Sequence, residues 1–269
     1  MKKTKWTASP YLVWMVAFIA VPLAIVVYFA FTDKAGHFTL ENIMGLGAYT
    51  TVFARSIVLA AIATAICLVL AFPVSYLLSR MRPASQRMMQ MLIMLPMWMN
   101  FLLRTMAWQT LLEKNGVING ILNWPHLPSQ SMINTPSAIV LGMVYNFLPF
   151  MVLPIYNVLS KIDDNIINVA MDLGANSFQR FTRIWFPLSI PGIISGITMV
   201  FVPSLTTFVI SDLLGGSKIL LIGNVIEQEF TRGSNWHLGS GLSLVLMVFI
   251  LISMAMIAKY DKNGEGTAF

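Results

Sequence analysis

The stretch Lys161–Gly192, KIDDNIINVAMDLGANSFQRFTRIWFPLSIPG, is a polar loop between two long apolar segments. Apolar residues recur at helical spacing in its first half, at Ile162, Ile166, Ala170 and Leu173. Asp163 or Asp164 can cap the start of this helix, because the helix dipole favours an acidic residue there. The pattern predicts a short amphipathic helix with one apolar face.

A second short helix is expected directly after the first. Gly174 follows the first helix at the position where glycine closes the last turn in the left-handed conformation. Ser177 is then placed to cap a helix that carries Phe178 and Phe181. Such a knob resembles one half of a helix-in-groove contact with another protein. A helix lying on the lipid surface is the alternative, although anionic headgroups would repel its acidic residues.

The segments outside this loop are long enough to cross a bilayer. Of the 269 residues, 57% are apolar and only 10% are charged, whereas soluble domains have about 25% charged residues. Apolar runs without acidic residues cover 11–32, 55–80, 88–112, 136–160, 184–211 and 238–258. Because open strands cannot pair their backbone groups in lipid, each run is expected to be a helix. The sequence predicts an all-α integral membrane protein of about six transmembrane helices.

The distribution of Lys and Arg predicts the orientation. Eleven of these residues fall on the side of the membrane that carries the loop at 161–187, and five fall on the other side. The cytoplasmic side normally carries the excess. Both termini are therefore expected in the cytoplasm. The first apolar run exceeds the roughly 7 to 15 residues of a secretory signal core, which argues against cleavage.

Several classes of function are disfavoured. Cys67 is the only cysteine, and the histidines His37, His126 and His237 are far apart in sequence, so neither a disulfide nor a metal site is predicted. The net charge of +6 does not come from a basic patch beside aromatic residues, which disfavours nucleic acid binding. Motifs for catalysis such as H-E-x-x-H and G-x-S-x-G are absent, so an enzyme is not predicted.

The loop carries the signature of binding-protein-dependent ABC importer permeases, E-A-A-x-x-x-G-x(9)-I-x-L-P. The matching residues are Ala170, Asp172, Leu173, Gly174, Ala175, Ile184 and Pro187. Asn168, Val169 and Phe186 replace the Glu, the first Ala and the Leu of the signature. The resemblance implies a type I ABC importer permease fold in a bacterial cytoplasmic membrane. Its shared transmembrane domain would cover 50–258, preceded by a first helix and outer loop in 1–49 and followed by a tail at 259–269.

In that family the loop is a coupling helix that sits in a cleft of a cytoplasmic ATPase. The resemblance assigns this role to Asp164, Asn168, Ala170, Asp172, Gly174, Ala175 and Phe178. It further implies a second permease subunit, two ATPase subunits and an external binding protein as partners. Since the chain has no G-x-x-x-x-G-K-[ST] run, ATP and Mg²⁺ are expected on the ATPase, and no cofactor is expected on this chain.

Within the family, three segments resemble the permeases of spermidine/putrescine importers: LPMWMNFLLR (95–104), LPFMVLPIY (148–156) and SDLLGGSKILLIGNVI (211–226). A polyamine path needs carboxylates as counter-charges and aromatic faces for cation–π contacts. The candidates are Trp98, Tyr145, Asp212 and Glu227. Arg104 is expected to reach the outer headgroups, unless it pairs with an acid such as Asp212.

Prolines at 96, 149, 154, 187, 191 and 203 punctuate three of the predicted spans. Broken spans suit a translocation path, and ordinary packing kinks are the alternative. Two other functions stay open: an ABC importer permease for another small solute, and an ion-coupled secondary transporter. The latter needs titratable groups in the membrane, but none of the six runs contains Asp, Glu or His; sodium sites made of carbonyls would not need them.

Overall fold

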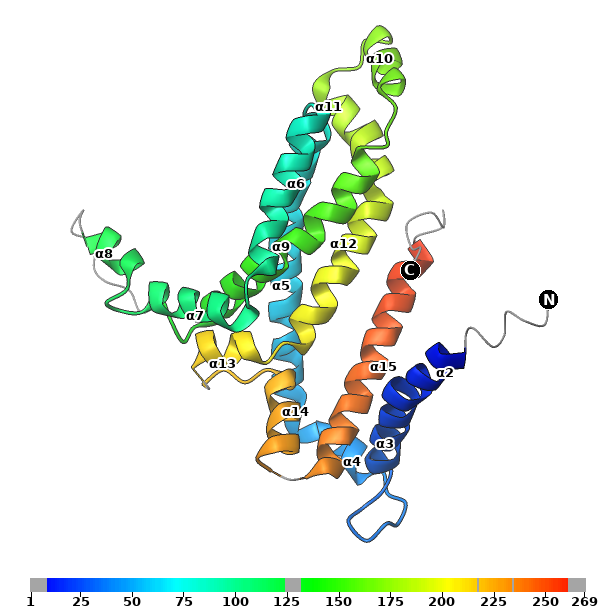
Figure 1. Cartoon of the computed structure of the whole chain (residues 1–269), viewed down its shortest axis with the longest axis vertical. Coiled ribbons are helices and arrows are strands. Elements are labelled where there is room, and N and C mark those ends of the chain that lie inside the picture. The colour runs from blue at the N-terminus through cyan, green and yellow to red at the C-terminus, as the bar shows by residue number, and fades with distance from the viewer. Residues whose placement is uncertain (1–8, 124–131, 217, 234, 261–269) are drawn as a thin grey trace, which may run out of the picture.

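The computed structural model describes residues 9–123, 132–216, 218–233 and 235–260, and these are helical almost throughout (Figure 1). The lysines at positions 2, 3 and 5, His126 and the tail from 261 lie outside the described residues. Five stretches are long and apolar enough to cross a membrane, and a bent pair of helices makes a sixth. The predicted all-α architecture of about six spans is therefore confirmed.

The first span joins α2 (Ser9–Met15), η1 (Val16–Ala20) and α3 (Val21–Ala30). The second, fourth and sixth spans are α5 (Leu46–Ser79), α9 (Pro136–Leu159) and α15 (Trp236–Tyr260). The fifth joins α11 (Ser177–Arg180), η2 (Phe181–Trp185) and α12 (Phe186–Thr206). The bent pair joins α6 (Pro83–Trp98) to the stretch Phe101–Ile121, which contains α7 (Phe101–Leu112) and most of α8 (Val117–Asn123). The other short helices are α4 (Glu41–Met44), α10 (Asp164–Asp172), α13 (Val209–Gly215) and α14 (Ile222–Thr231).

Helices α5, α9 and α12 pack against one another at the centre of the molecule. In α9, 67% of the most apolar window is buried, against 0% in the first span, so α9 is central and the first span peripheral. The close approach of α9 and α12 depends on Gly192, where an added Cβ would lie 2.8 Å from the carbonyl oxygen of Pro154. Small residues commonly allow such contacts between membrane helices.

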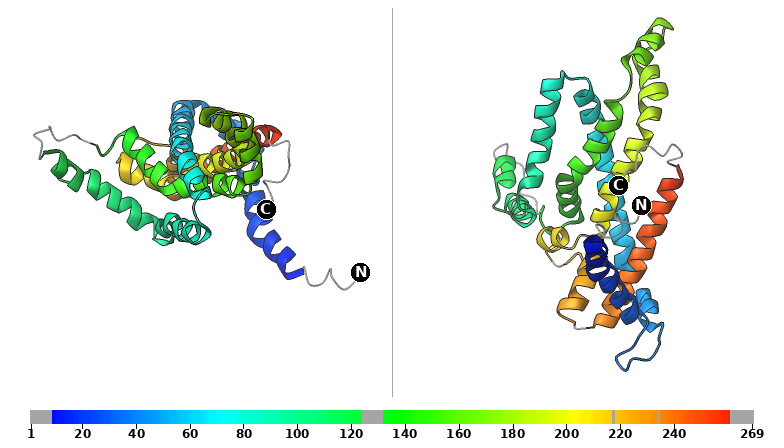
Figure 2. Two further views of the ribbon diagram at one scale, coloured as in Figure 1. Left: turned by 90° about the horizontal axis from the view of Figure 1, so that it is seen from above. Right: turned by 45° about the vertical axis from the view of Figure 1, so that its right-hand side comes forward.

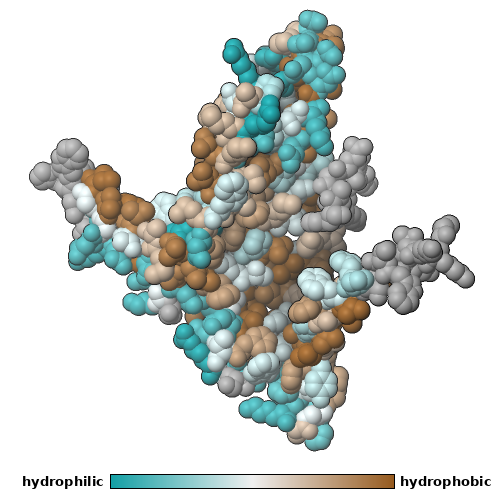
Figure 3. All heavy atoms as spheres, viewed as in Figure 1, coloured by the Kyte–Doolittle hydropathy of each residue, from teal (hydrophilic) through white to brown (hydrophobic). Residues whose placement is uncertain are grey.

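Helix α15 lies beside α3 at the edge of this core, and α14 packs against α15 (Figure 2). Helix α10 lies beyond the long helices at one end of the molecule, whereas α4 and α14 lie at the other end, where α14 packs beside the ends of α5 and α15 (Figure 1). Figure 3 shows hydrophilic residues gathered at these two ends and hydrophobic residues between them. Large apolar side chains stay exposed in between, including Phe18 at 67% and Val69 at 71%. Such a surface suits lipid or another subunit, not water.

The third predicted span, 88–112, is not a straight helix. Helices α6 and α7 meet at 87°, across a break at Met99 and Asn100. Pro96 lies in the last turn of α6, and the Asn100 side chain begins α7 by accepting hydrogen bonds from the amides of Leu102 and Leu103. A break near Pro96 was expected. The prolines inside α9 and α12, in contrast, leave those helices continuous.

The bend overturns the expectation that Arg104 reaches the outer headgroups. Arg104 is only 7% exposed, and its guanidinium donates to the carbonyl oxygen of Pro96. The same group lies 5.7 Å from the ring centre of Tyr145 and 6.0 Å from that of Phe101. Among the described residues it forms no ion pair with Asp212. The expectation assumed a straight helix, whereas the bend brings Arg104 back to the carbonyls that end α6.

We therefore predict that Arg104 fixes the angle between α6 and α7. Arg104→Leu removes the charged donor from the Pro96 carbonyl, which keeps only its 3.3 Å hydrogen bond from the Met99 amide; a hydrogen bond to a charged group contributes about 1.5–3 kcal/mol. Thermal unfolding of the purified chain should show a clearly lower Tm for this variant. Arg55→Leu, which removes an exposed arginine of α5, is the matched control and should leave the Tm unchanged. Equal Tm values for both variants would contradict the prediction.

Candidate functional site

The predicted docking loop forms two short helices at one end of the molecule (Figure 1). The Asp163 side chain caps α10 by accepting from the amide of Asn165 at 2.9 Å, which decides between the two acids considered. Gly174 ends the helix with a φ of +80°, so the predicted left-handed closure is confirmed. An added Cβ at Gly174 would meet no atom within 4 Å, so the glycine is needed for its backbone conformation and not for space.

The cap of the second helix was predicted one residue too late. Asn176, not Ser177, begins α11: its side chain accepts from the amide of Gln179 at 2.8 Å, and the Gln179 side chain accepts from the amide of Asn176 at 2.9 Å. This reciprocal capping box satisfies two amide donors at once, whereas a serine at 177 has no such partner arrangement. The sequence N-x-x-Q at 176–179 was the pattern that could have identified it.

The knob formed by α10 and α11 presents apolar side chains to its surroundings. Leu173 is 82% exposed and Phe178 is 74% exposed, and Ile166 and Val169 are also exposed. Only Ile167 turns inward and joins the core. Of the predicted coupling residues, Asp164, Asn168, Asp172, Gly174 and Phe178 are exposed, while Ala170 and Ala175 are half-buried. An apolar face of this size on a short polar-rimmed helix pair suits a groove in a partner protein.

Two of the predicted path residues come together at the opposite end. Asp212 lies in α13 and Glu227 in α14, and both helices are joined by the buried side chain of Asn224. The Asn224 amide group donates to a carboxylate oxygen of Asp212 at 2.8 Å and to the carbonyl of Phe208 at 3.0 Å. Its oxygen accepts from the hydroxyl of Ser211 and from the amide of Leu221. Asn224 was not singled out in the sequence, although it is a polar residue inside the apolar run LLIGNVI.

The electrostatic environment of Asp212 favours a cation. Helix α13 lies outside the stretches long enough to span the membrane. Burial raises the pKa of Asp212 above its ordinary value, and the negative charge of Glu227 raises the pKa further, while Arg232 and the Asn224 hydrogen bond act in the opposite direction. The dependence on Glu227 means that two carboxylates share one region, where a nearby positive charge would stabilise both.

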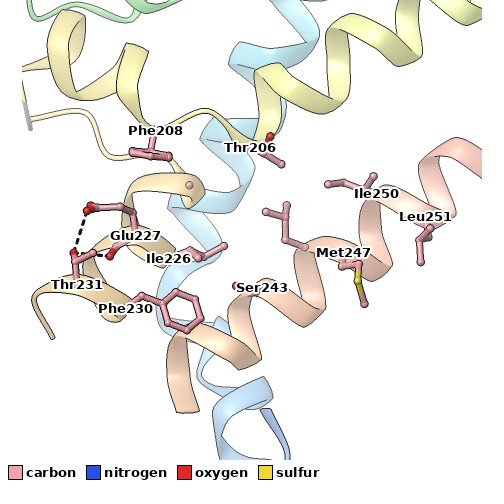
Figure 4. Close-up of a pocket in the computed structure, with 12 residues that line it drawn as sticks. Thr206, Phe208, Ile226, Glu227, Phe230, Thr231, Ser243, Met247, Ile250 and Leu251 are labelled. Atoms are coloured by element: carbon pink, nitrogen blue, oxygen red, sulfur yellow. Dashed lines mark hydrogen bonds between the residues drawn. The ribbon is translucent and has the colours of Figure 1, made fainter. Parts of the chain in front are cut away.

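A cavity of about 530 Å³ opens beside Glu227, between the end of α12, helix α14 and helix α15 (Figure 4). Its lining is mostly apolar, and Glu227 is the one charged side chain among the twelve that line it. The lining residues are Thr206, Phe208, Gly223, Ile226, Glu227, Phe230, Thr231, Ser243, Leu246, Met247, Ile250 and Leu251. The Thr231 hydroxyl lies 2.7 Å from the backbone carbonyl oxygen of Glu227 and 3.0 Å from a carboxylate oxygen of the same residue, at the margin of the cavity. The cavity therefore combines aromatic walls with a carboxylate, which suits an aliphatic cation.

The other two path candidates do not join this cavity. Tyr145 packs edge-on against Trp108 at 5.2 Å and faces Arg104, so it belongs to the bend between α6 and α7. Trp98 ends α6 and is 80% exposed, so it faces outward from this chain. The structure thus brings together Asp212 and Glu227 and separates them from Tyr145 and Trp98.

Known proteins with similar sequences are permease components of transport systems. A family model described as binding-protein-dependent transport system inner membrane component matches residues 65–262. The spermidine/putrescine transport system permease protein PotB of Haemophilus influenzae is 36% identical over 276 residues, which cover 97% of this chain and 94% of PotB. PotB of Escherichia coli is 37% identical over 246 residues, with coverage of 87% and 89%.

A solved structure shares the fold. It is the crystal structure of a bacterial ABC transporter involved in the import of the acidic polysaccharide alginate, with a TM-score of 0.79 at 16% identity and coverage of 96% of each chain. The same kind of transporter, in complex with an alginate pentasaccharide-bound periplasmic protein, matches with a TM-score of 0.76 at 16% identity, covering 99% of this chain and 96% of the other. This likeness concerns the fold alone. With the family model covering most of the chain, the protein belongs to the binding-protein-dependent transport system inner membrane components and is a multi-pass permease of an ABC importer.

Proposed function

We propose that this chain is a permease subunit of an ATP-driven importer that moves spermidine or putrescine across the cytoplasmic membrane by alternating access. It would pair with a second permease subunit, receive the polyamine from an external binding protein, and have both termini in the cytoplasm. The transporter would contain two separate ATPase subunits, which hydrolyse ATP with Mg²⁺, and one of them would dock on the α10–α11 knob. The chain itself would be neither an enzyme nor a cofactor-binding protein.

The exposed apolar face of the knob supports the coupling role. Leu173 and Phe178 have no neighbours within this chain that would shield them from water, and a contact with another protein would remove that exposure. The charged residues Asp172 and Arg180 lie on the same two helices and can orient such a contact. The membrane surface is a poorer partner because the acidic residues of α10 are repelled by anionic lipids.

The observation that carries the polyamine assignment is Glu227 in the lining of an aromatic cavity, with Asp212 close enough to feel its charge, in a chain so similar to the spermidine/putrescine permeases. A polyamine has several protonated amines on an apolar chain. Carboxylates can neutralise the amines while Phe208 and Phe230 contact the methylene groups and the cations. An acidic solute would be repelled by this pair and a neutral solute would not neutralise its charge, which disfavours a permease for such solutes. An ion-coupled carrier is disfavoured by membership of the ABC importer family.

We predict that the two carboxylates lower the KM for polyamines. Asp212→Asn keeps an acceptor for the Asn224 amide and removes only the charge, and Glu227→Gln does the same beside Thr231. Each loss of a partly exposed charge contact costs about 1 kcal/mol, so the KM for labelled spermidine should rise about fivefold per substitution. Uptake is measured in proteoliposomes that contain the complete transporter with its binding protein.

Glu41→Gln is the matched control for this prediction, because Glu41 is an exposed acid of α4 at the same end of the molecule and does not line the cavity. Its KM should equal that of the unsubstituted chain. If Asp212→Asn and Glu227→Gln together also leave the KM unchanged, the carboxylates are not part of the polyamine path.

We also predict that the angle between α10 and α11 is needed for coupling. Gly174→Val forces a β-branched residue into a left-handed conformation, which costs about 1–2 kcal/mol and shifts the direction of α10. ATP-driven uptake should fall while ATP hydrolysis by the partner persists. Gly174→Asn should retain most of the uptake, because asparagine tolerates that conformation. Equal uptake by the valine and asparagine variants would show that the angle is unimportant.

A further inference from the structure

The end of α5 touches both ends of the α10–α11 loop through one side chain. Arg80 follows the last residue of α5, and its guanidinium forms an ion pair with the carboxylate of Asp164, the first residue of α10. The same guanidinium lies over the indole ring of Trp185, 3.9 Å from the ring centre. Trp185 is the last residue before α12. Arg80 therefore joins the chain entering the loop to the chain leaving it.

The two partners of Arg80 differ in how firmly they are held. Trp185 is only 4% exposed and also packs edge-on against Tyr76 of α5 at 5.2 Å, so it is fixed to the helix core. The Asp164 side chain is 74% exposed and that of Arg80 is 32% exposed. Arg80 thus connects an exposed acid at the base of the knob to a buried aromatic at the start of a span.

The backbone between these partners departs from regular α-helix just before α12. Residues Phe181–Trp185 form a turn of π-helix, directly before Pro187 at the start of α12. Proline removes the amide that would continue the regular ladder, and π-turns often mark functional sites in helices. Besides Arg80, the ring of Phe72 holds this turn to α5 by packing against Phe181 at 5.4 Å. A force on α10 can reach α12 through the backbone only across this turn.

Exposed ion pairs contribute little to stability, so the contact with Asp164 is not explained as a device to hold the fold together. A planar guanidinium that stacks on an indole and pairs with a carboxylate has a defined orientation, which an ammonium group would not have. This arrangement can couple the orientation of α10 to the orientation of the spans α5 and α12.

We propose that Arg80 is the positioning residue that makes α5 and α12 move with the α10–α11 knob, by holding Asp164 and Trp185 to the same guanidinium. This role rests on the proposed coupling to an ATPase. In this role, the backbone is not the only connection between the knob and α12. When α10 tilts, Asp164 pulls on Arg80 at the end of α5, and Arg80 pulls on Trp185 before α12.

The test compares Arg80→Gln with Arg80→Lys and with the double variant Arg80→Gln and Asp164→Asn in the complete transporter. The measured quantity is polyamine transported per ATP hydrolysed. Arg80→Gln should lower this ratio about tenfold, a change typical of coupling between sites. Arg80→Lys should be intermediate, because it keeps the ion pair and loses the planar stacking. The double variant Arg80→Gln with Asp164→Asn should be no worse than Arg80→Gln alone, because the two residues act through one contact.

Arg82→Gln is the matched control, since Arg82 is an exposed arginine in the same turn. It should leave the ratio unchanged. A merely structural role of Arg80 would reduce the amount of assembled complex, and with it uptake and hydrolysis equally, without changing the ratio. An unchanged ratio in Arg80→Gln would overturn the proposal.

A second readout does not depend on transport. Spin labels at positions 165 in α10 and 88 in α6, in a chain carrying Cys67→Ser, report the orientation of the knob. The distance distribution should broaden in Arg80→Gln and stay narrow in Arg82→Gln; a narrow distribution in both would overturn the positioning role. If the unsubstituted transporter shows no ATP-driven polyamine uptake while Arg80→Gln still broadens the distribution, the proposed function fails and the positioning role stands.

Discussion

The structure depends on one constraint: inside a bilayer no water is present to satisfy a backbone amide or carbonyl. Long helices meet this requirement for their own backbone, and side chains complete it where a helix stops. At the break in the third span, Asn100 accepts from two amides at the start of α7, and Arg104 donates to the Pro96 carbonyl of α6, which also accepts from the Met99 amide. An arginine that looks costly in a membrane is therefore a capping group for a helix that ends inside the protein.

The same requirement explains the polar side chains between the helices. The Ser75 hydroxyl of α5 donates to the carbonyl of Val152 in α9 at 2.9 Å, two residues before Pro154. The Ser56 hydroxyl accepts from the amide of Ile222 at the start of α14 at 2.8 Å. Each bond joins helices that are far apart in the sequence. The core is thus apolar in its bulk and is aligned by a few hydrogen bonds whose donors and acceptors have no water as an alternative.

The two ends of the molecule use polar groups differently. At the end with α13 and α14, Asn224 gathers four hydrogen-bonding groups and leaves Asp212 close to Glu227 beside an apolar cavity. At the other end, the caps Asp163 and Asn176 shape a knob whose apolar side chains stay exposed. One end therefore has a carboxylate in the lining of a cavity, and the other has exposed apolar side chains on the α10–α11 knob. In the proposed function, the first end would receive the cation and the second would dock the ATPase.

The sequence by itself determined the helical spans, the polar loop at 161–192 and the left-handed glycine at 174, because these follow from local composition, hydrogen bonding and backbone sterics. It also marked Asp212 and Glu227 as candidates. Only the tertiary structure decided that these two acids share a region, that Tyr145 and Trp98 do not, and that Arg104 turns back to Pro96. Those outcomes depend on an 87° bend and on contacts between residues far apart in the chain, such as Arg80 with Asp164, which helical periodicity does not encode.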